Sequence, residues 1–352
     1  MSSLLNRFSN VFVNGKKDSI NNGGTENSEK QNGGRTSEID NQFEIPKNRL
    51  KRDDRALGNG IFGFVRSGTL QIDNNRENDI KVAIKSVRYV SNSNCVKAIH
   101  KEIKVLASLV PHPNILTFFG FVKSRNPEIV SELVKSGNLR SFLRTRRARF
   151  KDQILYTNSN PREKTEKFEN IEMSTDQKSL CTFDLISFAY QIANGMEYLA
   201  SVPCNHRNLA VHNIFISHDN TIRIGSFAFS GRHGNNENYL CQMAEDQLIP
   251  KSSTPPEVYV HLNTSEKTDV YGFALLLNGL FNLGEPYYGH PIDPFLSFPR
   301  PEFCPPQIYE LMLKCCNSDP ALRPTFTECV TFFADFLDIQ NMQASNIFEY
   351  LD

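Results

Sequence analysis

The chain has 352 residues, and its 39 Lys and Arg balance 39 Asp and Glu, so no net charge draws it toward nucleic acid or an anionic membrane. Apolar residues make up 39% of the chain and charged residues 22%, which suits one large domain of two lobes or two ordinary domains. The most apolar stretch, residues 270–283, is too short for the roughly 20 residues that span a bilayer. We expect no nucleic-acid partner and no membrane span.

The cysteines and the start of the chain indicate a cytoplasmic protein. None of the cysteines forms a C-x-x-C pair or stands at zinc-finger spacing from a histidine, so we expect reduced thiols. The first residues, MSSLLNR, contain no apolar signal segment, and Ser2 stands where N-myristoylation requires glycine. Secretion and a simple lipid anchor are therefore not expected. The eight cysteines are Cys95, Cys181, Cys204, Cys241, Cys304, Cys315, Cys316 and Cys329.

The first part of the chain predicts a disordered segment, then a small sheet and one helix. Residues 14–41 carry too little apolar surface to offset the entropy of ordering, so residues 1–42 are predicted to be disordered. Between residues 61 and 90, short β-rich runs alternate with polar turns, which indicates an antiparallel meander. Residues 96–110 then predict a helix with one apolar face, formed by Ile99, Ile103, Leu106 and Leu109.

The rest of the chain predicts mostly helices after a polar interruption. Residues 144–178 are polar and charged, and are most simply a surface insertion. The basic run at their start, RTRRAR, could contact a phosphate, but a solvated surface is the simpler interpretation. Helical patterns follow at residues 183–199, 269–283 and 306–316. We therefore expect a mostly α lobe.

Residues 57–65, LGNGIFGFV, contain the pattern G-x-G-x-x-G, formed by Gly58, Gly60 and Gly63. A dinucleotide-binding fold would need a helix directly after this motif, whereas β-type sequence follows here. The glycines suit a hairpin whose backbone lies close to nucleotide phosphates, because no Cβ blocks the approach. A glycine-rich hairpin without a ligand explains the motif by itself equally well.

The strand pattern VAIK ends in Lys85, and the predicted helix that follows offers Glu102. In this arrangement the Lys85 ammonium can reach phosphate oxygens while the Glu102 carboxylate holds it in place. Lys85 alone would be interpreted as a surface lysine at the end of a strand. The glycine loop, the strand and the carboxylate in this order favour a phosphate-binding site.

Residues 206–213, HRNLAVHN, resemble the catalytic loop H-R-D-L-A-A-R-N of protein tyrosine kinases. The likeness runs in order from about Phe43 to Phe333, and it is especially similar to the split kinase domains of fibroblast and vascular endothelial growth factor receptors. Other motifs at family positions are GNLRSFLR (137–144), GMEYLAS (195–201), GSFA (225–228) at D-F-G, PPE (255–257) at A-P-E, DVYGF (269–273) and RPTF (323–326).

The resemblance implies an α+β, two-lobed protein-kinase-like fold over residues 43–340, with a β-rich N-lobe carrying one helix and a mostly α C-lobe. Its expected parts are the N-lobe at 43–131, the hinge at 132–135, the insert at 144–178, the C-lobe at 179–340 and a tail at 341–352.

The resemblance also implies an ATP site and assigns residues to it by matching positions. Lys85 and the three loop glycines would hold the phosphates, and the hinge would bond the base through the Glu132 carbonyl and the Val134 amide. Ser131 is a small residue just before the hinge, where it would leave room behind the adenine. The apolar walls would be Leu57, Val65 and Ala83 above the adenine and Phe215 below it, although each of these residues would also suit an ordinary core.

Two departures from the family pattern weaken the chemistry. Asn208 stands at the catalytic Asp, and Ser226 stands at the Asp of D-F-G that binds Mg²⁺. An amide is a far poorer proton acceptor than a carboxylate, and positioned general base catalysis is worth roughly 10²–10⁴-fold. Asn213, at the second metal-ligand position, would have to hold magnesium almost alone, so a Mg²⁺ site is doubtful and nucleotide binding is expected to do without the metal.

Three functions remain open. The first is a tyrosine-kinase-like pseudokinase that binds nucleotide and acts as a regulator or scaffold in phosphotyrosine signalling, through protein partners that include an active kinase. The second is a slow but genuine kinase that transfers phosphate from ATP to protein tyrosine with Asn208 and Asn213 in compromised roles. The third is a structural scaffold with an empty cleft.

Some matched positions are expected to be structural. Glu257 and Arg323 would form a buried pair, and Asp269 would brace the catalytic loop. Tyr239 lies where receptor kinases carry activation-loop tyrosines, and Arg207 could pair with a phosphate there, although an unmodified loop tyrosine is an equally good interpretation.

Overall fold

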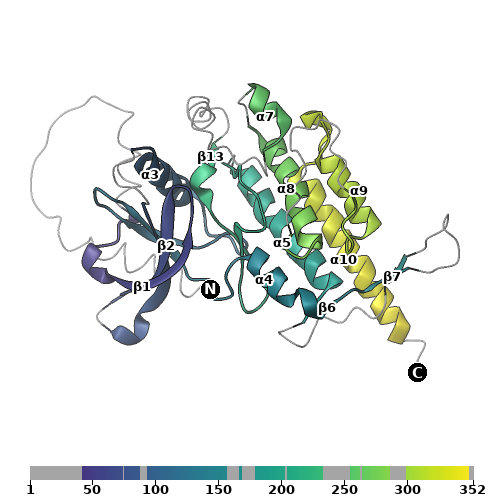
Figure 1. Ribbon diagram of the computed structural model, residues 1–352, viewed down its shortest axis with the longest axis horizontal. Coiled ribbons are helices and arrows are strands. Elements are labelled where there is room, and N and C mark those ends of the chain that lie inside the picture. The colour runs from purple at the N-terminus through teal and green to yellow at the C-terminus, as the bar shows by residue number, and fades with distance from the viewer. Residues whose placement is uncertain are drawn as a thin grey trace, which may run out of the picture. The chain divides into compact units, whose positions relative to one another are not determined.

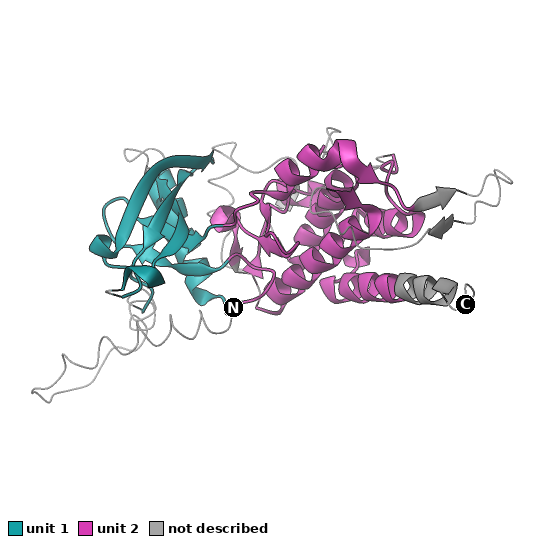
Figure 2. Ribbon diagram, turned by 90° about the horizontal axis from the view of Figure 1, so that it is seen from below, with its two compact units in different colours: residues 1–111, 117–133 teal, residues 112–116, 134–352 magenta. Residues whose placement is uncertain are grey.

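The structure is a computed structural model that describes residues 42–73, 75–87, 93–156, 166–168, 179–202, 204–232, 254–261, 264–285 and 299–348. It divides into two compact units, shown in teal and magenta in Figure 2. Unit 1 comprises residues 1–111 and 117–133, and unit 2 comprises residues 112–116 and 134–352. The boundary between residues 133 and 134 falls inside the segment that was expected to form a hinge. The predicted disordered residues up to 41 lie outside the described residues.

Unit 1 is built on a five-stranded sheet in which all neighbouring strands are antiparallel. In spatial order the strands are β1 (Leu50–Asn59), β2 (Gly63–Leu70), β3 (Ile80–Val87), β5 (Glu128–Glu132) and β4 (Phe118–Val122). The meander predicted for residues 61–90 is therefore confirmed as β2–β3, and β1 extends it at the N-terminal side. One short 3₁₀ turn, η1 (Lys47–Arg49), precedes β1, and another, η2 (Arg76–Asn78), lies between β2 and β3.

One long helix, α3 (Ser93–Ser108), packs on this sheet (Figure 1). Its buried side chains recur at helical spacing, which is why this segment forms a helix with one face against the sheet. They are Cys95, Ala98, Ile99, Glu102, Ile103 and Leu106. Glu102 is the only carboxylate among them, and its presence in an apolar face is costly unless a cation pairs with it.

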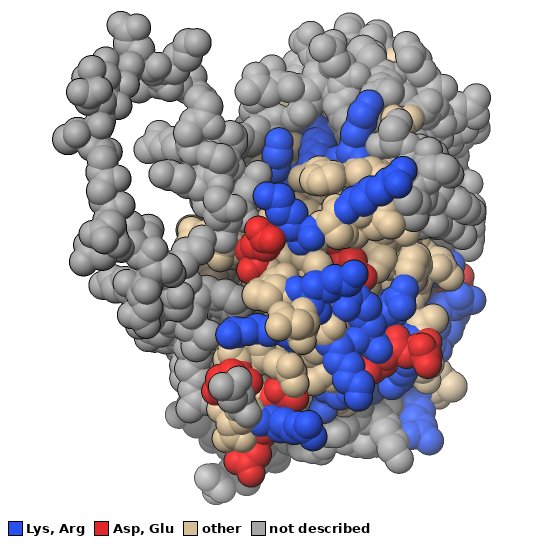
Figure 3. Space-filling view, turned by 90° about the vertical axis from the view of Figure 1, so that its left-hand side faces the viewer, with Lys and Arg blue, Asp and Glu red and all other residues tan. Residues whose placement is uncertain are grey.

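Charged side chains cover the face of unit 1 that Figure 3 shows, with Lys and Arg spread widely and Asp and Glu among them. Several of these cations have a carboxylate of their own. Arg52 Nε lies 3.0 Å from Glu128 Oε2, and Lys81 Nζ lies 3.3 Å from Asp53 Oδ2. Local pairing therefore offsets part of the positive charge of this unit.

Unit 2 consists mainly of helices (Figure 1). The described helices are α4 (Leu139–Arg146), α5 (Thr182–Ser201), α7 (Pro256–His261), α8 (Glu266–Phe281), α9 (Pro306–Cys315) and α10 (Phe326–Phe348). Helix α5 packs against α8 and α10, and α8 also packs against α9. A sheet-rich N-lobe and a helical C-lobe confirm the predicted α+β, two-lobed kinase-like fold.

Short strands in the segments between these helices pair with one another. They are β6 (Phe150–Lys151) with β9 (Leu180–Cys181), β7 (Ile154–Tyr156) with β8 (Glu166–Phe168), β10 (Cys204–Asn205) with β13 (Gly231–Arg232), and β11 (Ile214–Ile216) with β12 (Ile222–Ile224). The pairs β10–β13 and β11–β12 frame the segments that carry the candidate catalytic residues.

The boundaries expected for the insert and for the tail both fall inside helices. The insert was expected to begin at residue 144, but α4 continues to Arg146 and a 3₁₀ turn, η3 (Arg147–Arg149), follows directly. The tail was expected to begin at residue 341, but α10 continues to Phe348. At the ends of α4 and α10 the sequence becomes more polar, and the helical lobe was therefore expected to end there. The helices continue because polar residues do not by themselves end a helix.

None of the helices in the described residues is both long and apolar enough to cross a membrane. The cysteines within those residues are free and buried, in agreement with the expected thiols. They are Cys95, Cys181, Cys204, Cys304, Cys315, Cys316 and Cys329, and Cys241 lies outside the described residues.

Candidate active site

The glycine-rich motif forms the turn between β1 and β2, as the β-type sequence after it predicted. Gly60 N donates to Gly63 O at 2.7 Å and closes the turn. A Cβ on Gly63 would lie 2.5 Å from Ser86 O, so the approach of β3 requires glycine there. A Cβ on Gly58 would meet nothing within 4 Å. Packing in unit 1 thus accounts for Gly63, and it leaves open space beside Gly58.

Lys85 on β3 and Glu102 on α3 form an ion pair, which confirms the predicted pairing. The Lys85 Nζ to Glu102 Oε2 distance is 2.6 Å, and the two side chains are 20% and 4% exposed. A nearly buried carboxylate with one cation partner fixes the position of that cation, because separating them would leave Glu102 unpaired in an apolar face. Lys85 therefore presents a positioned ammonium.

Most of the residues predicted for the adenine roof and the hinge lie in the sheet of unit 1, whereas Val134 belongs to unit 2. Val65 on β2 pairs with Lys85, and Ala83 on β3 pairs with Ser131 on β5. Leu57, on β1, is exposed. The Glu132 carboxylate accepts from Thr117 N at 2.8 Å and from its hydroxyl at 3.1 Å, so the end of β5 is tied to the strand beside it. Their roles toward a base remain predictions.

The catalytic-loop segment of unit 2 lies between β10 and β11, and Asp269 on α8 holds its backbone. The Asp269 carboxylate accepts from His206 N and from Arg207 N, both at 2.7 Å, which confirms the predicted bracing. The loop also closes on itself, since Asn213 Nδ2 donates to Asn208 O at 2.8 Å. Asn208 is half-buried and Asn213 is buried.

Ser226 lies two residues after the end of β12, and its neighbour Gly225 is bonded to the same loop. Gly225 N donates to Asn213 O at 3.0 Å, and the His206 ring bonds Gly225 O through Nε2 at 2.9 Å. These bonds bring Asn208, Asn213 and Ser226 together within unit 2. Ser226 has φ 67° and ψ 58°, a left-handed conformation that is uncommon for residues other than glycine, Asn and Asp.

Phe215 on β11 packs closely against Gly225. A Cβ on Gly225 would come within 2.8 Å of the Phe215 ring, so only glycine lets the ring lie this close to the backbone before Ser226. Phe215 is half-buried. The geometry gives Phe215 a structural reason to be where it is, and its role as an adenine floor stays a prediction.

The donor set of this loop does not fit a magnesium ion. Mg²⁺ prefers carboxylate and water oxygens, whereas Asn208 and Asn213 offer amide oxygens and Ser226 offers a neutral hydroxyl. Across the described part of the chain, no group of three or more His, Cys, Asp or Glu side chains is placed to hold a metal. Asn208, Asn213 and Ser226 thus bring no negative charge to this loop that would attract a metal ion.

Burial of the loop shifts two pKa values in opposite directions. Complete burial of His206 lowers its pKa from 6.5 to about 4, against the raising effect of its bond to Gly225. Burial raises the pKa of Asp269 from 3.8 to about 6, although the backbone bonds from Arg207 and His206 oppose that shift. His206 is therefore neutral at neutral pH, with its ring packed edge-on against Phe227 at 5.2 Å.

The shift of His206 predicts a pH dependence of stability. The unfolded chain takes up a proton on His206 near pH 6.5, while the folded chain resists protonation until about pH 4. The stabilising contribution is thus fully present above pH 6.5 and is lost as the pH falls through about 4, by roughly 3 kcal/mol. Asp269 acts in the opposite direction between about pH 6 and 4, which reduces the net change.

Urea unfolding of the unmodified chain and of His206→Phe between pH 7.5 and 4.5 separates the two groups, because both chains keep Asp269. We expect the stability advantage of the unmodified chain to shrink as the pH falls. Parallel stability curves for the two chains would mean that His206 does not resist protonation.

The structure changes the interpretation of Arg207. Its guanidinium was expected to be available for a phosphate on Tyr239, but Arg207 is buried, and its Nε donates to Thr264 Oγ1 at 3.0 Å. Thr264 also accepts from Asn205 Nδ2 at 3.2 Å. Thr264 is a structural partner that sequence analysis missed, because a single threonine far along the chain carries no pattern. Tyr239 lies outside the described residues.

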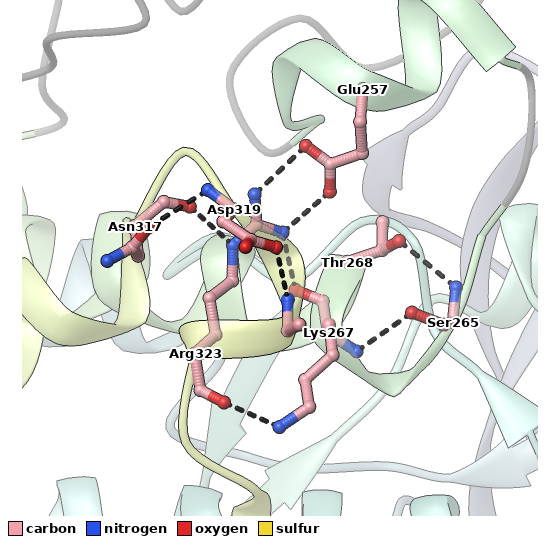
Figure 4. A network of polar contacts seen from close by, with 8 residues as sticks. Glu257, Ser265, Lys267, Thr268, Asn317, Asp319 and Arg323 are labelled. Carbon is pink, nitrogen blue, oxygen red and sulfur yellow. Dashed lines mark hydrogen bonds and ion pairs between the residues drawn. The ribbon is translucent and has the colours of Figure 1, made fainter.

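The predicted pair of Glu257 and Arg323 is confirmed and belongs to a wider network (Figure 4). Arg323 donates to both Glu257 oxygens, at 2.6 and 2.9 Å. The same guanidinium donates to the carbonyls of Asn317 at 2.8 Å and Lys267 at 2.9 Å. The network connects the neighbouring helices α7 and α8 with the turn after α9, which lies much further along the chain.

Comparisons with known proteins agree with this architecture. Residues 52–333 match the family described as protein tyrosine and serine/threonine kinase. The chain is 34% identical over 342 residues to the receptor-like tyrosine-protein kinase kin-15 of Caenorhabditis elegans, which covers 89% of this chain and 69% of that protein. It is 35% identical over 300 residues to the tyrosine-protein kinase receptor old-1 of the same organism, which covers 79% of this chain and 56% of that protein.

A third relative is fibroblast growth factor receptor 1 of Dugesia japonica, which is 28% identical over 319 residues, covering 88% of this chain and 34% of the receptor. The chain therefore spans between about a third and about two thirds of the length of these three relatives. With its sheet-rich and helical lobes and its ordered motifs, the chain belongs to the protein tyrosine and serine/threonine kinase family and is related to receptor tyrosine kinases.

Proposed function

We propose that this chain is a tyrosine-kinase-like pseudokinase that binds ATP, transfers phosphate poorly, and acts as a regulator or scaffold in phosphotyrosine signalling. One observation carries the proposal: the ion pair of Lys85 with Glu102 is formed, whereas Asn208 and Ser226 replace the two carboxylates of the family motifs. Nucleotide binding and phosphate transfer depend on different residues. The chain can therefore keep nucleotide binding and lose most of its phosphate transfer.

The features of unit 1 support nucleotide binding. Lys85 is held by a nearly buried carboxylate, which suits a cation that bonds phosphate oxygens. The open space beside Gly58 suits a backbone that lies close to a phosphate, since packing within unit 1 does not itself require glycine there. Bound ATP would supply the phosphates for these groups and the base for the end of β5.

The features of unit 2 argue against efficient transfer. A carboxylate at position 208 would accept the proton of the attacking hydroxyl, and an amide at Asn208 can orient that hydroxyl but accepts the proton poorly. Because the donors at Asn213 and Ser226 do not fit Mg²⁺, the chain also lacks the charge that most stabilises phosphoryl transfer. We therefore infer nucleotide binding that does not depend on the metal.

Thermal unfolding with ATP tests the binding half of the proposal. A ligand that binds only the folded state raises the melting temperature, by roughly 2–4 °C for each kcal/mol of stabilisation. We expect equal rises with Mg²⁺ and with EDTA, and no rise in Lys85→Met. Each variant is compared with its own ligand-free melting temperature, because Lys85→Met also leaves Glu102 unpaired.

The outcomes separate the alternatives. No rise at any ATP concentration would favour the scaffold with an empty cleft. A rise that persists in Lys85→Met would place the nucleotide elsewhere. The variant Lys85→Met with Glu102→Gln restores neutrality in the core of unit 1, and it should show the same lack of response to ATP.

A slow but genuine kinase is the second candidate, and the backbone of unit 2 favours it. The bonds of Asn213 to Asn208 and of Gly225 to Asn213 keep the loop closed without the missing carboxylates. Asn208 is thus held where it could orient a hydroxyl. The transfer assay that decides between the two candidates is described in the Discussion.

We propose a cytoplasmic location and protein partners, among them an active kinase. The location is supported by the buried, free thiols of the described residues, since a reducing compartment keeps cysteines unpaired. The partner class is supported by the family alone.

A further inference from the structure

Three arginines form a row along α4 and the turn after it, which we name the arginine stripe: Arg140, which is half-buried, and Arg144 and Arg147, which are exposed. Helix α4 buries Leu139, Phe142 and Leu143. Positions 140, 144 and 147 follow one another at spacings of four and three residues, so they lie on one side of the helix. Arg144 and Arg147 have side chains that are 53% and 54% exposed.

The stripe begins at the catalytic loop. Arg140 N donates to Val211 O at 3.1 Å. Arg140 Nε is buried, and within the described residues it has no hydrogen-bond partner. The first arginine of the stripe thus lies beside the loop with unused donor capacity.

One carboxylate, that of Glu285, pairs with two of the three arginines. Glu285 Oε1 lies 3.2 Å from Arg144 Nε and 3.8 Å from an Arg147 guanidinium nitrogen. Gly284 makes this possible, because with φ +90° it brings the chain so close that a Cβ would lie 2.8 Å from Arg140 O. Among the described residues, Arg144 and Arg147 share one carboxylate, so the stripe stays positive there. In unit 1, by contrast, Lys81 and Lys85 each have an acidic partner.

Helix stability does not explain the stripe. A cation in the last turn of a helix interacts favourably with the helix dipole, which accounts for Arg144. A cation in the first turn interacts unfavourably with the dipole, and Arg140 stands there with no acidic residue in that turn. Arg140 therefore makes α4 less stable, which is understandable if its charge serves binding.

We propose that the arginine stripe docks an acidic segment of a protein partner, laid along α4 from the catalytic loop outward. From Arg140 to Arg147 the helix rises about 10 Å, which equals about three residues of extended chain. A segment with Asp or Glu at successive positions can therefore reach all three guanidinium groups. This docking does not require bound nucleotide, so it stands or falls independently of ATP binding.

Fluorescence anisotropy with the full chain tests the proposal. The probes are a labelled peptide rich in glutamate and the same peptide with glutamine in place of each glutamate. We expect the glutamate peptide to bind tighter, and Arg144→Gln with Arg147→Gln to weaken it by about fivefold. The matched control, Lys97→Gln with Lys104→Gln, removes two exposed charges from α3 and should leave the affinity unchanged.

Glu285→Gln provides a test of opposite sign. It frees Arg144 and Arg147 from their carboxylate, so the glutamate peptide should bind about twofold tighter. Equal affinity for the two peptides would overturn the proposal, and so would an equal loss in the α3 control variant. Binding to phosphatidylserine vesicles without binding to the peptide would also overturn it, since the stripe would then recognise a membrane surface.

Discussion

Replacing both Asn208 and Ser226 with aspartate should increase phosphate transfer from ATP by at least about 100-fold, because a positioned general base alone is worth roughly 10²–10⁴-fold. The backbone is ready for both changes. Asn and Asp have nearly the same shape, and the Asn208 carbonyl is already held by Asn213. Ser226 has a left-handed conformation that Asp adopts more readily than most residues. The measurement is transfer of labelled phosphate to a tyrosine peptide, with Mg²⁺ present.

Control variants show which residues cause that increase. Lys85→Met in the restored chain should abolish the gain, since Lys85 is the positioned cation of unit 1. Asn208→Asp alone should recover less than the pair, because Ser226→Asp supplies the carboxylate that a metal needs. If the unmodified chain transfers phosphate as fast as the restored chain, and Lys85→Met stops it, the slow-kinase candidate is correct and the pseudokinase proposal is wrong.

Arg323→Leu should lower the free energy of unfolding by about 3–5 kcal/mol, the range expected when a buried ion pair loses one partner. The Arg323 side chain is 0% exposed, and its loss leaves the Glu257 carboxylate unpaired. Two carbonyls, those of Asn317 and Lys267, lose their donor as well. The measurement is urea unfolding at pH 7. Arg323→Lys should not rescue the stability, because an ammonium cannot reproduce the planar fork that bonds both Glu257 oxygens.

Arg144→Leu is the control for this effect. Arg144 also pairs with one glutamate, but it is half-exposed, so its loss should cost no more than about 1 kcal/mol. Removing both partners with Arg323→Leu and Glu257→Leu should restore part of the stability, since no unpaired charge remains. Equal and small losses for Arg323→Leu and Arg144→Leu would show that the network of Figure 4 adds little to folding.

The sequence predicted the helices well where apolar spacing was regular and less well at their ends. Helix α8 was expected from residue 269, but it begins at Glu266 because Ser265 and Thr268 cap it. Ser265 N donates to Thr268 Oγ1 at 3.1 Å, and Lys267 N donates to Ser265 Oγ at 3.2 Å. The end of a helix depends on one or two capping side chains, whereas the apolar periodicity that indicates a helix is averaged over many residues. The presence of a helix is therefore easier to predict than the residue at which it begins or ends.

The candidate site likewise contains residues that the sequence predicted and contacts that it did not. The motifs around Lys85, Asn208 and Ser226 could be found because kinase motifs follow a fixed order along the chain. Long-range contacts between residues outside these motifs could not be found, since no local pattern records them. Thr264 bonding Arg207 and Gly284 lying against α4 are two such contacts. The first contact gives Arg207 a hydrogen-bond partner inside the protein. The second brings Glu285 close to the arginine stripe.

The bracing of the catalytic loop by Asp269 has a dynamic consequence. Loops generally open locally at little cost, but the amides of His206 and Arg207 are buried and bonded to a side chain of α8. The loop can release these bonds only when the core of the lobe itself opens. It therefore belongs to the cooperative unit of the helices, and substitutions at its catalytic positions can accumulate without loosening it.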